Sequence, residues 1–251
     1  MFILGKSVRG KRDYNQDSIY HGERNGCFIM AVADGVGGSS GGDIASGIVT
    51  EVCQQLFGEF SDNPSRESLK STLQRIAEIS SSRISEETER RPEYNSMATT
   101  LTVATGYGQN YVVGNIGDSR TYLISEGGAE QITEDHTYIK EIENKYNEQI
   151  IESLREEMGH VITRSVSREQ SPIDIFPEAE ECFTLREGDT LLLCSDGMIP
   201  DQNRGMESVF SSAIRDSISM KEALDRLIEW ALENGSLDNI SVVIGKNANR
   251  E

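Results

Sequence analysis

The sequence predicts an α+β fold of antiparallel β-strands covered by helices, in one domain over residues 1–251. Two observations indicate this class: several strand-like segments follow one another closely, and two segments with helical apolar spacing lie among them. A chain of 251 residues can bury one substantial core, and no stretch of it has the composition of a linker.

The strand-like segments are rich in apolar and β-branched residues. Residues 28–33 run without polar alternation, which is typical of a strand buried on both faces. We expect a short strand near residues 13–20, and residues 99–105, 111–116 and 121–124 are predicted to form a meander of consecutive strands. Further strand-like segments lie at 173–184, 190–194 and 240–244.

Three helices are predicted. Residues 43–57 and 65–91 form two of them and are expected to cover one face of a sheet. The third begins at a capping box, in which Ser219 accepts from first-turn amides and Glu222 reaches back. It continues with an apolar stripe at positions i, i+3, i+4 and i+7 and ends before Gly235.

Residues 133–165, which we call the flap, are polar and acid-rich, and their helical periodicity is broken. We interpret the flap as a surface insertion. A segment of this length over a site acts as a lid or recognition element, although a solvated pair of helices fits the same pattern.

Four aspartates stand at the ends of strand-like segments. Asp34, Asp118 and Asp196 each follow an apolar run, and Asp238 precedes one. Because one antiparallel strand ends beside the start of the next, these carboxylates can gather at one rim of a sheet. Clustered carboxylates without His or Cys suit Mg²⁺, Mn²⁺ or Ca²⁺. The residues therefore predict a metal site, although any one of these aspartates could instead cap a helix or start a turn.

Arg9, Lys11 and Arg12 form a basic cluster in a protein of net charge −18. Arginines beside acidic residues indicate a phosphate site next to a metal, because the guanidinium matches phosphate oxygens and keeps its charge.

Composition excludes several classes of function. The net charge of −18 argues against nucleic acid or an anionic membrane as a partner. No apolar run is long enough to cross a bilayer, and the first residues lack the pattern of a signal peptide, so we expect a cytoplasmic protein. The four cysteines form no CxxC pair, and we expect no disulfides. None of them is followed by arginine six positions later, so the loop of the cysteine-dependent phosphatases is missing.

Six motifs occur in the order and rough spacing of one enzyme family. They are Arg12-x-x-Asn15-Gln16-Asp17, Ala33-Asp34-Gly35-Val36-Gly37-Gly38, Thr99-Thr100-Leu101, Gly117-Asp118-Ser119-Arg120, Ser195-Asp196-Gly197 and Asp238-Asn239. Over residues 12–244 the chain resembles the metal-dependent Ser/Thr protein phosphatases (PPM family, type 2C), and in particular their compact bacterial members. The resemblance implies an α-β-β-α sandwich, with two antiparallel sheets flanked by helix pairs and a flap insertion.

The resemblance also implies the chemistry. Members hydrolyse phosphoserine and phosphothreonine in proteins by direct attack of a metal-bridging hydroxide, with two Mn²⁺ or Mg²⁺ ions and, in bacterial relatives, a third. By analogy Asp34 bridges two ions and is catalytic, Gly35 offers its carbonyl, and Asp196 and Asp238 complete the shell of the first ion.

Three further roles are implied in the same way. Asp118, together with Asp196, would hold the third ion, and Asp17 would act at the edge of the metal shell. Arg12 would bind the substrate phosphate and is the other catalytic residue. The implied partners are phosphorylated proteins and a cognate Ser/Thr kinase, and we expect a monomer. Val36 stands where many eukaryotic relatives carry a histidine proposed as general acid, so the proton donor is unassigned.

Two other functions fit parts of the sequence. The run Gly37-Gly38-Ser39-Ser40-Gly41 matches the nucleophile elbow of serine hydrolases, and a triad would join Ser39 to His136 or His160. That hypothesis leaves the four strand-end aspartates unexplained. The other alternative is a catalytically inactive phosphatase-fold module that binds phosphoproteins or acts as a scaffold; it would have lost metal carboxylates that this sequence retains.

Overall fold

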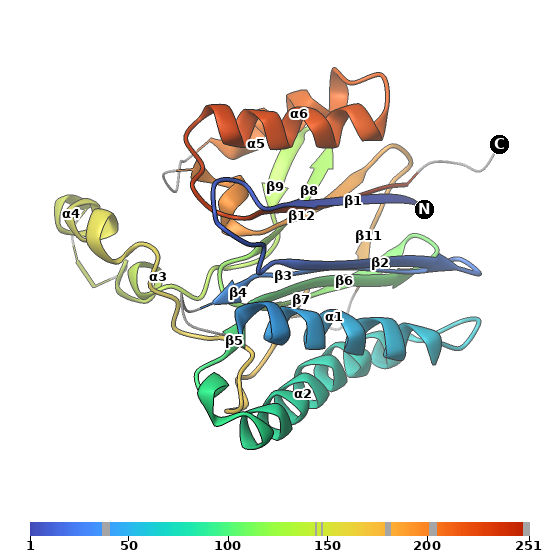
Figure 1. The fold of residues 1–251 in the computed structure, drawn as a ribbon. Helices are drawn as coiled ribbons and strands as arrows, with labels where there is room; N and C mark the ends of the chain where they lie inside the picture. Colours follow the sequence, from blue (N-terminus) through green and yellow to red (C-terminus); the bar gives the residue numbers. More distant parts are fainter. Residues whose placement is uncertain (37–40, 144, 147, 179–181, 201–204, 248–251) are drawn as a thin grey trace.

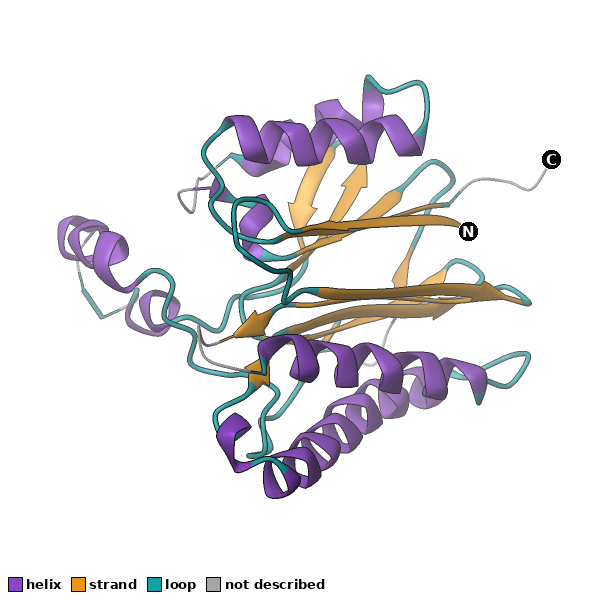
Figure 2. Ribbon diagram, viewed as in Figure 1, coloured by secondary structure: helices purple, strands orange, loops and turns teal. Residues whose placement is uncertain are grey.

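Two antiparallel β-sheets stack face to face in the computed structural model, and helices cover the outer face of each sheet (Figure 1). The structure describes residues 1–36, 41–143, 145–146, 148–178, 182–200 and 205–247. Figure 2 shows the same layers by secondary-structure type, helix outside and strand inside. This arrangement confirms the α-β-β-α sandwich.

The first sheet contains both chain-terminal strands. Its order is β1 (Phe2–Val8), β13 (Ile240–Lys246), β12 (Thr190–Cys194), β8 (Arg120–Ser125) and β9 (Gly128–Gln131). Helices α5 (Met206–Arg215) and α6 (Met220–Glu233) cover its outer face (Figure 1). Side chains of α6 such as Leu227 and Ile228 pack there against Val242 and Ile244 of β13.

The second sheet holds the strand at 28–33. Its order is β10 (Asp174–Phe176), β7 (Asn110–Ile116), β6 (Leu101–Tyr107), β3 (Cys27–Ala33) and β2 (Ser18–Arg24), and β11 (Phe183–Thr184) pairs with β7. Helices α1 (Gly42–Gly58) and α2 (Arg66–Arg90) cover its outer face (Figure 1). A short ribbon of β4 (Gly35–Val36) and β5 (Ala98–Thr99) extends one end.

Strand β3 is buried on both faces, as its unbroken apolar sequence predicts. Ile29 and Ala31 pack in the cluster under α1 and α2, whereas Phe28, Met30 and Val32 pack between the two sheets. All seven residues of β3 are buried, so this strand fixes the position of Asp34, the residue that follows it.

The three predicted helices are confirmed, with small shifts at their ends. Ser65 caps α2 by accepting from the Ser68 amide, and Ser219 caps α6 by accepting from the Glu222 amide. The Glu222 carboxylate accepts from the Ile218 amide, one residue before the N–H that a capping box would use.

The predicted meander is wrong in its third strand. Strands β6 and β7 pair as expected, but β8 belongs to the other sheet. The chain leaves β7 through Gly117, whose φ of +102° disfavours any other residue, and crosses to the first sheet over Asp118 and Ser119. Strand β1 and helix α5 were not predicted, and the short strand near residues 13–20 is the longer β2.

The flap contains α3 (Tyr138–Ile142) and α4 (Glu148–Met158), which project from the sandwich beside one end of the sheets (Figure 1). Ile139, Ile142 and Ile151 form a small apolar cluster of their own there. The flap therefore contains a pair of helices, placed beside the strand ends, and both interpretations of its role remain predictions. Within the described ranges, no helix is both long and apolar enough to span a bilayer.

Candidate metal centre and active site

The four strand-end aspartates meet at one end of the sandwich. Asp34 follows β3 and Asp118 follows β7, which run in the same direction with β6 between them. Asp196 follows β12 and Asp238 precedes β13, its antiparallel neighbour in the other sheet. The prediction of a single rim is thus corrected: two sheets contribute two aspartates each, and the site lies where the strand ends of the two sheets face each other.

Two threonines fix the backbone of Asp34. The Asp34 amide donates to Thr100 Oγ1 at 3.0 Å, and the Asp34 carbonyl accepts from the Thr100 amide and from Thr99 Oγ1, both at 2.8 Å. Thr100 Oγ1 also shares a hydrogen bond of 2.7 Å with Ser119 Oγ, next to Asp118. Asp34 and the Asp118 turn are therefore held by one set of hydroxyls.

Asp17 lies buried beneath these aspartates. Its Oδ2 accepts from Ser195 Oγ at 2.9 Å, and Ser195 Oγ in turn accepts from the Ser241 amide at 3.0 Å. Its Oδ1 is buried and has no hydrogen-bond partner among the described residues, and the same holds for Asp196 Oδ1. Two carboxylate oxygens with no donor indicate a missing positive ligand, because native structures rarely leave such atoms unpaired.

Burial and mutual repulsion raise the pKa of each buried carboxyl group. Burial, then the neighbouring carboxylates Asp17, Asp196 and Asp118, hold the pKa of Asp34 well above its usual range. Burial and the charge of Asp196 raise the pKa of Asp118 to about 8. Burial raises the pKa of Asp17 to about 6, although hydrogen bonds from serines oppose the shift. The pKa of Asp196 is raised as well, by burial and by Asp238.

These residues fit a divalent cation better than any other group. Within the described ranges, no three Asp, Glu, His or Cys side chains already converge as a finished metal site. The carboxylates are nevertheless packed closely enough to disfavour their own ionisation, and cations would remove that repulsion. The donors are all oxygens, which suits Mn²⁺ or Mg²⁺ rather than Zn²⁺.

A cleft of about 450 Å³ opens over the carboxylates. Its lining includes Arg12, Tyr14, Val36, His160 and Ile162, together with four aspartates and the glycine of the predicted site: Asp34, Gly35, Asp118, Asp196 and Asp238. Arg12 Nη2 donates to Asp238 Oδ2 at 2.7 Å. The hydrogen bond to Asp238 raises the pKa of Arg12, so its guanidinium stays charged in the cleft.

Asn239 is a positioning residue that the sequence did not identify. Its Nδ2 donates to the carbonyls of Arg9 and Tyr14 at 2.8 and 2.9 Å, and its Oδ1 accepts from the Gln16 amide at 2.9 Å. It thereby closes the loop that carries Arg12. In the sequence, Asn239 is marked only by its place in an Asp-Asn pair before a strand. That pair does not indicate that the buried side-chain amide hydrogen-bonds three backbone groups.

His136 is also structural. Its Nδ1 accepts from the Gly117 amide at 3.0 Å, and its Nε2 donates to Asp174 Oδ2 at 2.9 Å. Burial by itself would raise the pKa of Asp174. The hydrogen bonds from His136 and Arg164 outweigh burial and lower that pKa below its usual value. With both ring nitrogens engaged, His136 cannot be the base of a serine-hydrolase triad. Ser39, the proposed nucleophile of that triad, lies outside the described residues.

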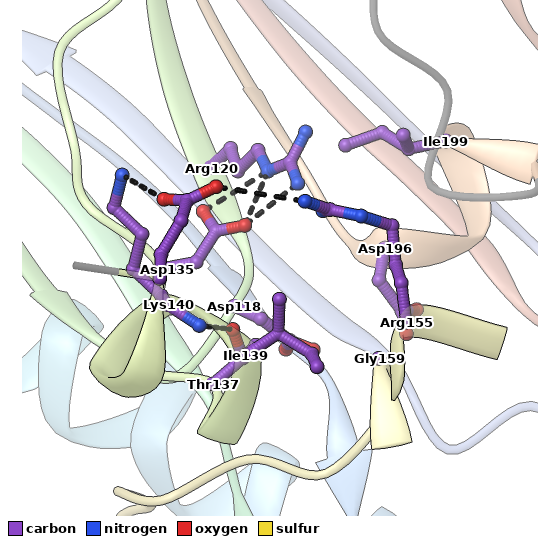
Figure 3. A pocket seen from close by; sticks show the side chains of 11 residues that line it. Asp118, Arg120, Asp135, Thr137, Ile139, Lys140, Arg155, Gly159, Asp196 and Ile199 are labelled. Carbon is purple, nitrogen blue, oxygen red and sulfur yellow. Dashed lines mark hydrogen bonds and ion pairs between the residues drawn. The ribbon is translucent and has the colours of Figure 1, made fainter. Parts of the chain in front are cut away.

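An ion pair attaches the flap beside the site, and further ion pairs join its own helices. Arg120, two residues after Asp118, holds Asp135 through both carboxylate oxygens at 2.6 to 3.0 Å. Glu143 accepts from Lys140 at 3.1 Å and from Arg155 at 3.5 Å, which ties α3 to α4. These side chains line a small pocket of about 110 Å³ that reaches Asp118 and Asp196 (Figure 3).

The structure thus brings together every residue of the predicted site. Arg12, Asp34, Gly35, Asp118, Asp196 and Asp238 line the cleft, and Asp17 lies under it. The sequence shows the supporting residues Thr99, Thr100, Ser195 and Asn239 only as parts of motifs, because their roles depend on hydrogen bonds between distant segments.

Comparison with known proteins agrees with this geometry. The family model described as protein phosphatase 2C matches residues 4–240. The serine/threonine protein phosphatase PstP of Mycobacterium tuberculosis is 32% identical over 246 residues, which are 95% of this chain and 43% of PstP. This chain therefore spans less than half the length of PstP. The serine/threonine phosphatase stp of Listeria monocytogenes is 28% identical over 243 residues, which are 95% of this chain and 93% of stp.

Solved structures share the whole fold. The crystal structure of M. tuberculosis PstP/Ppp superposes with a TM-score of 0.83 at 29% identity, covering 99% of each chain. The catalytic domain of PstP in complex with two manganese ions superposes with a TM-score of 0.81 at 30% identity, covering 99% of this chain and 98% of that one. From its motifs, its sandwich and these matches, the chain belongs to the protein phosphatase 2C family.

Proposed function

We propose that this chain is a metal-dependent protein serine/threonine phosphatase, which hydrolyses phosphoserine and phosphothreonine in proteins. One observation carries the proposal: Arg12 and the four aspartates predicted to bind metal line a single open cleft, so a phosphate-binding cation and a metal-binding cluster share one space. Family membership and the names of the relatives support it. Retention of all the carboxylates argues against an inactive binding module.

The predicted ligand set fits two divalent ions. Asp34, the carbonyl of Gly35, Asp196 and Asp238 would hold them, and Asp118 with Asp196 offers oxygens for a third. When bound, the ions would supply Lewis-acid activation of water and neutralise charge on the phosphoryl group. The manganese complex of the PstP catalytic domain supports this assignment.

The side chains of the cleft have separate tasks. Arg12 would bind and orient the phosphate, because its planar guanidinium matches two phosphate oxygens. Thr99 and Thr100 keep Asp34 in place through its backbone. Val36 lines the cleft but can neither donate nor accept a proton, so this chain does not use that position as a general acid.

The cleft is open enough for a protein segment. Tyr14, Ile162 and His160 form parts of its wall, and Tyr14 and His160 are exposed. Phosphorylated proteins are therefore the proposed substrates, a Ser/Thr kinase the proposed opposing enzyme, and the monomer the proposed working form. We place the enzyme in the cytoplasm, which agrees with four free thiols and with an acidic surface that does not suit anionic membranes.

The test is hydrolysis of a phosphothreonine peptide by wild type and Asp34→Asn, each with Mn²⁺ or with EDTA. We expect activity in wild type with Mn²⁺ and in no other combination. Asp216→Asn, an exposed carboxylate on the far helical layer, is the matched control and should keep full activity. A folded, Mn²⁺-loaded wild type without turnover would refute the proposal, and EDTA-resistant hydrolysis would refute the metal mechanism.

A further inference from the structure

The ion pair between Arg12 and Asp238 occupies two groups that the proposed function assigns to other ligands. Arg12 Nη2 donates to Asp238 Oδ2 at 2.7 Å, and Asp238 Oδ1 accepts from the Asn239 amide at 2.8 Å. Both oxygens of Asp238 thus already have a donor. The same guanidinium is the group that would bind the substrate phosphate.

The backbone keeps this pair together. Asn239 joins the two ends of the Arg12 loop through the carbonyls of Arg9 and Tyr14. Gly10 lies against Asp238 so closely that a Cβ at position 10 would be 2.1 Å from the Asp238 carbonyl oxygen. Arg12 and Asp238 are therefore held within reach of each other, and only side-chain rotation can separate them.

Charge makes the two partners of Asp238 incompatible. A divalent ion at Oδ2 would lie against a guanidinium, and the repulsion between the two cations favours one or the other. The side chains are about half and one-third exposed, at 56% for Arg12 and 36% for Asp238, so Arg12 can leave the pair and remain in the cleft.

We propose that Arg12 and the divalent cation compete for Asp238, so that metal loading releases Arg12 to bind the substrate phosphate. Arg12 acts as a substitute cation while the metal is away, and phosphate recognition is completed only in the loaded protein. Because coupling is reciprocal, phosphate that draws Arg12 away from Asp238 also raises the affinity for the metal.

The test measures metal binding, by calorimetric titration of Mn²⁺ into wild type, Arg12→Ala and Arg9→Ala. Arg9 is the matched control, because it carries the same charge on the same loop but its guanidinium donates to the Asp13 carbonyl at 3.2 Å. We expect Arg12→Ala to bind Mn²⁺ about three- to fivefold more tightly than wild type, the value of an exposed ion pair. Arg9→Ala should stay within about twofold of wild type.

Two results would overturn the inference. An equal gain in Mn²⁺ affinity in Arg12→Ala and Arg9→Ala would show that only the net charge of the loop matters. An unchanged or weaker Mn²⁺ affinity in Arg12→Ala would show that Arg12 and the metal bind Asp238 together. Arg12→Gln repeats the measurement with a polar side chain if the alanine variant does not fold. The inference rests on the proposed function for the identity of the metal, but the titration needs no turnover. Mn²⁺ binding without hydrolysis would therefore refute the function and still decide this point.

Discussion

Thr100 holds Asp34 through two reciprocal hydrogen bonds, accepting from the Asp34 amide at 3.0 Å and donating its own amide to the Asp34 carbonyl at 2.8 Å. The carboxylate that the family assigns to two ions is thus positioned by its backbone. None of these hydrogen bonds uses the Asp34 carboxylate, which leaves its oxygens for cations.

Thr100→Val should lower kcat/KM and Mn²⁺ affinity by about 10- to 100-fold, the usual effect of losing a group that orients a ligand. The change keeps the shape of the side chain but leaves the Asp34 amide without its acceptor. Thr102→Val is the matched control: Thr102 lies in β6, and its buried hydroxyl bonds Oγ1 of Thr121 on β8 at 2.7 Å, outside the lining of the cleft. Each variant should lose about 1 kcal/mol of stability. Equal activity in the two variants would contradict this role.

Mn²⁺ should stabilise the fold, because it binds the native carboxylate cluster and not the unfolded chain. At a hundredfold excess over Kd the gain is about 2.7 kcal/mol. For a domain of this size that corresponds to a rise in Tm of roughly 5–10 °C. Differential scanning calorimetry with Mn²⁺ or EDTA measures it, and an unchanged Tm at saturating metal would contradict the predicted site.

The stability of the metal-free protein should fall as pH rises from 5 to 8. The pKa of Asp17 is raised to about 6 and that of Asp118 to about 8, against about 3.9 in the unfolded chain. Between these values the folded state binds more protons than the unfolded state, so these groups stabilise at low pH and lose their contribution as pH rises through the folded pKa.

Urea unfolding in EDTA at pH 5 and pH 8 measures this slope. We expect the free energy of unfolding to be lower at pH 8 by on the order of 5 kcal/mol, most of it from Asp118. Asp118→Asn should remove most of the difference, and saturating Mn²⁺ should remove it as well, because the ligands then stay ionised. A metal-free wild type that is equally stable at both pH values would show that the carboxyl groups do not repel one another.

The sequence predicted the parts of the fold that depend on local pattern. The seven buried residues of β3 and the capped helices α2 and α6 follow from apolar spacing and from Ser65 and Ser219. The sequence did not predict features that depend on which sheet each strand joins. Nothing local indicates that β8 leaves the sheet of β7, because Gly117 provides the turn but not its destination.

The same limit applies to the site. Asp34, Asp118 and Asp196 could be identified at the ends of apolar strands and Asp238 at the start of one, and the six motifs in order identified the family. The Arg12–Asp238 pair and the three hydrogen bonds of Asn239 join residues more than 200 positions apart. The two-sheet arrangement likewise depends on strands that are not consecutive in the chain. Such contacts form only when the two sheets pack together, and no local pattern of residues in the sequence indicates them.

The ion pair of Arg120 and Asp135 should be essential to the attachment of the flap. Its side chains are only 19% and 15% exposed, and the short bidentate contact keeps Arg120 charged next to Asp118. Asp135→Asn leaves this guanidinium without its counter-charge and should destabilise the protein by about 3 kcal/mol. The double variant Arg120→Met, Asp135→Leu removes both charges and should lower the free energy of unfolding by less than the single variant.

Urea unfolding of the two variants beside wild type measures the difference, with Asp216→Asn as an exposed control of the same chemistry. If the single variant were as stable as wild type, the pair would contribute no more than a surface contact, and the hydrogen bonds of His136 to Gly117 and Asp174 would have to hold the flap instead.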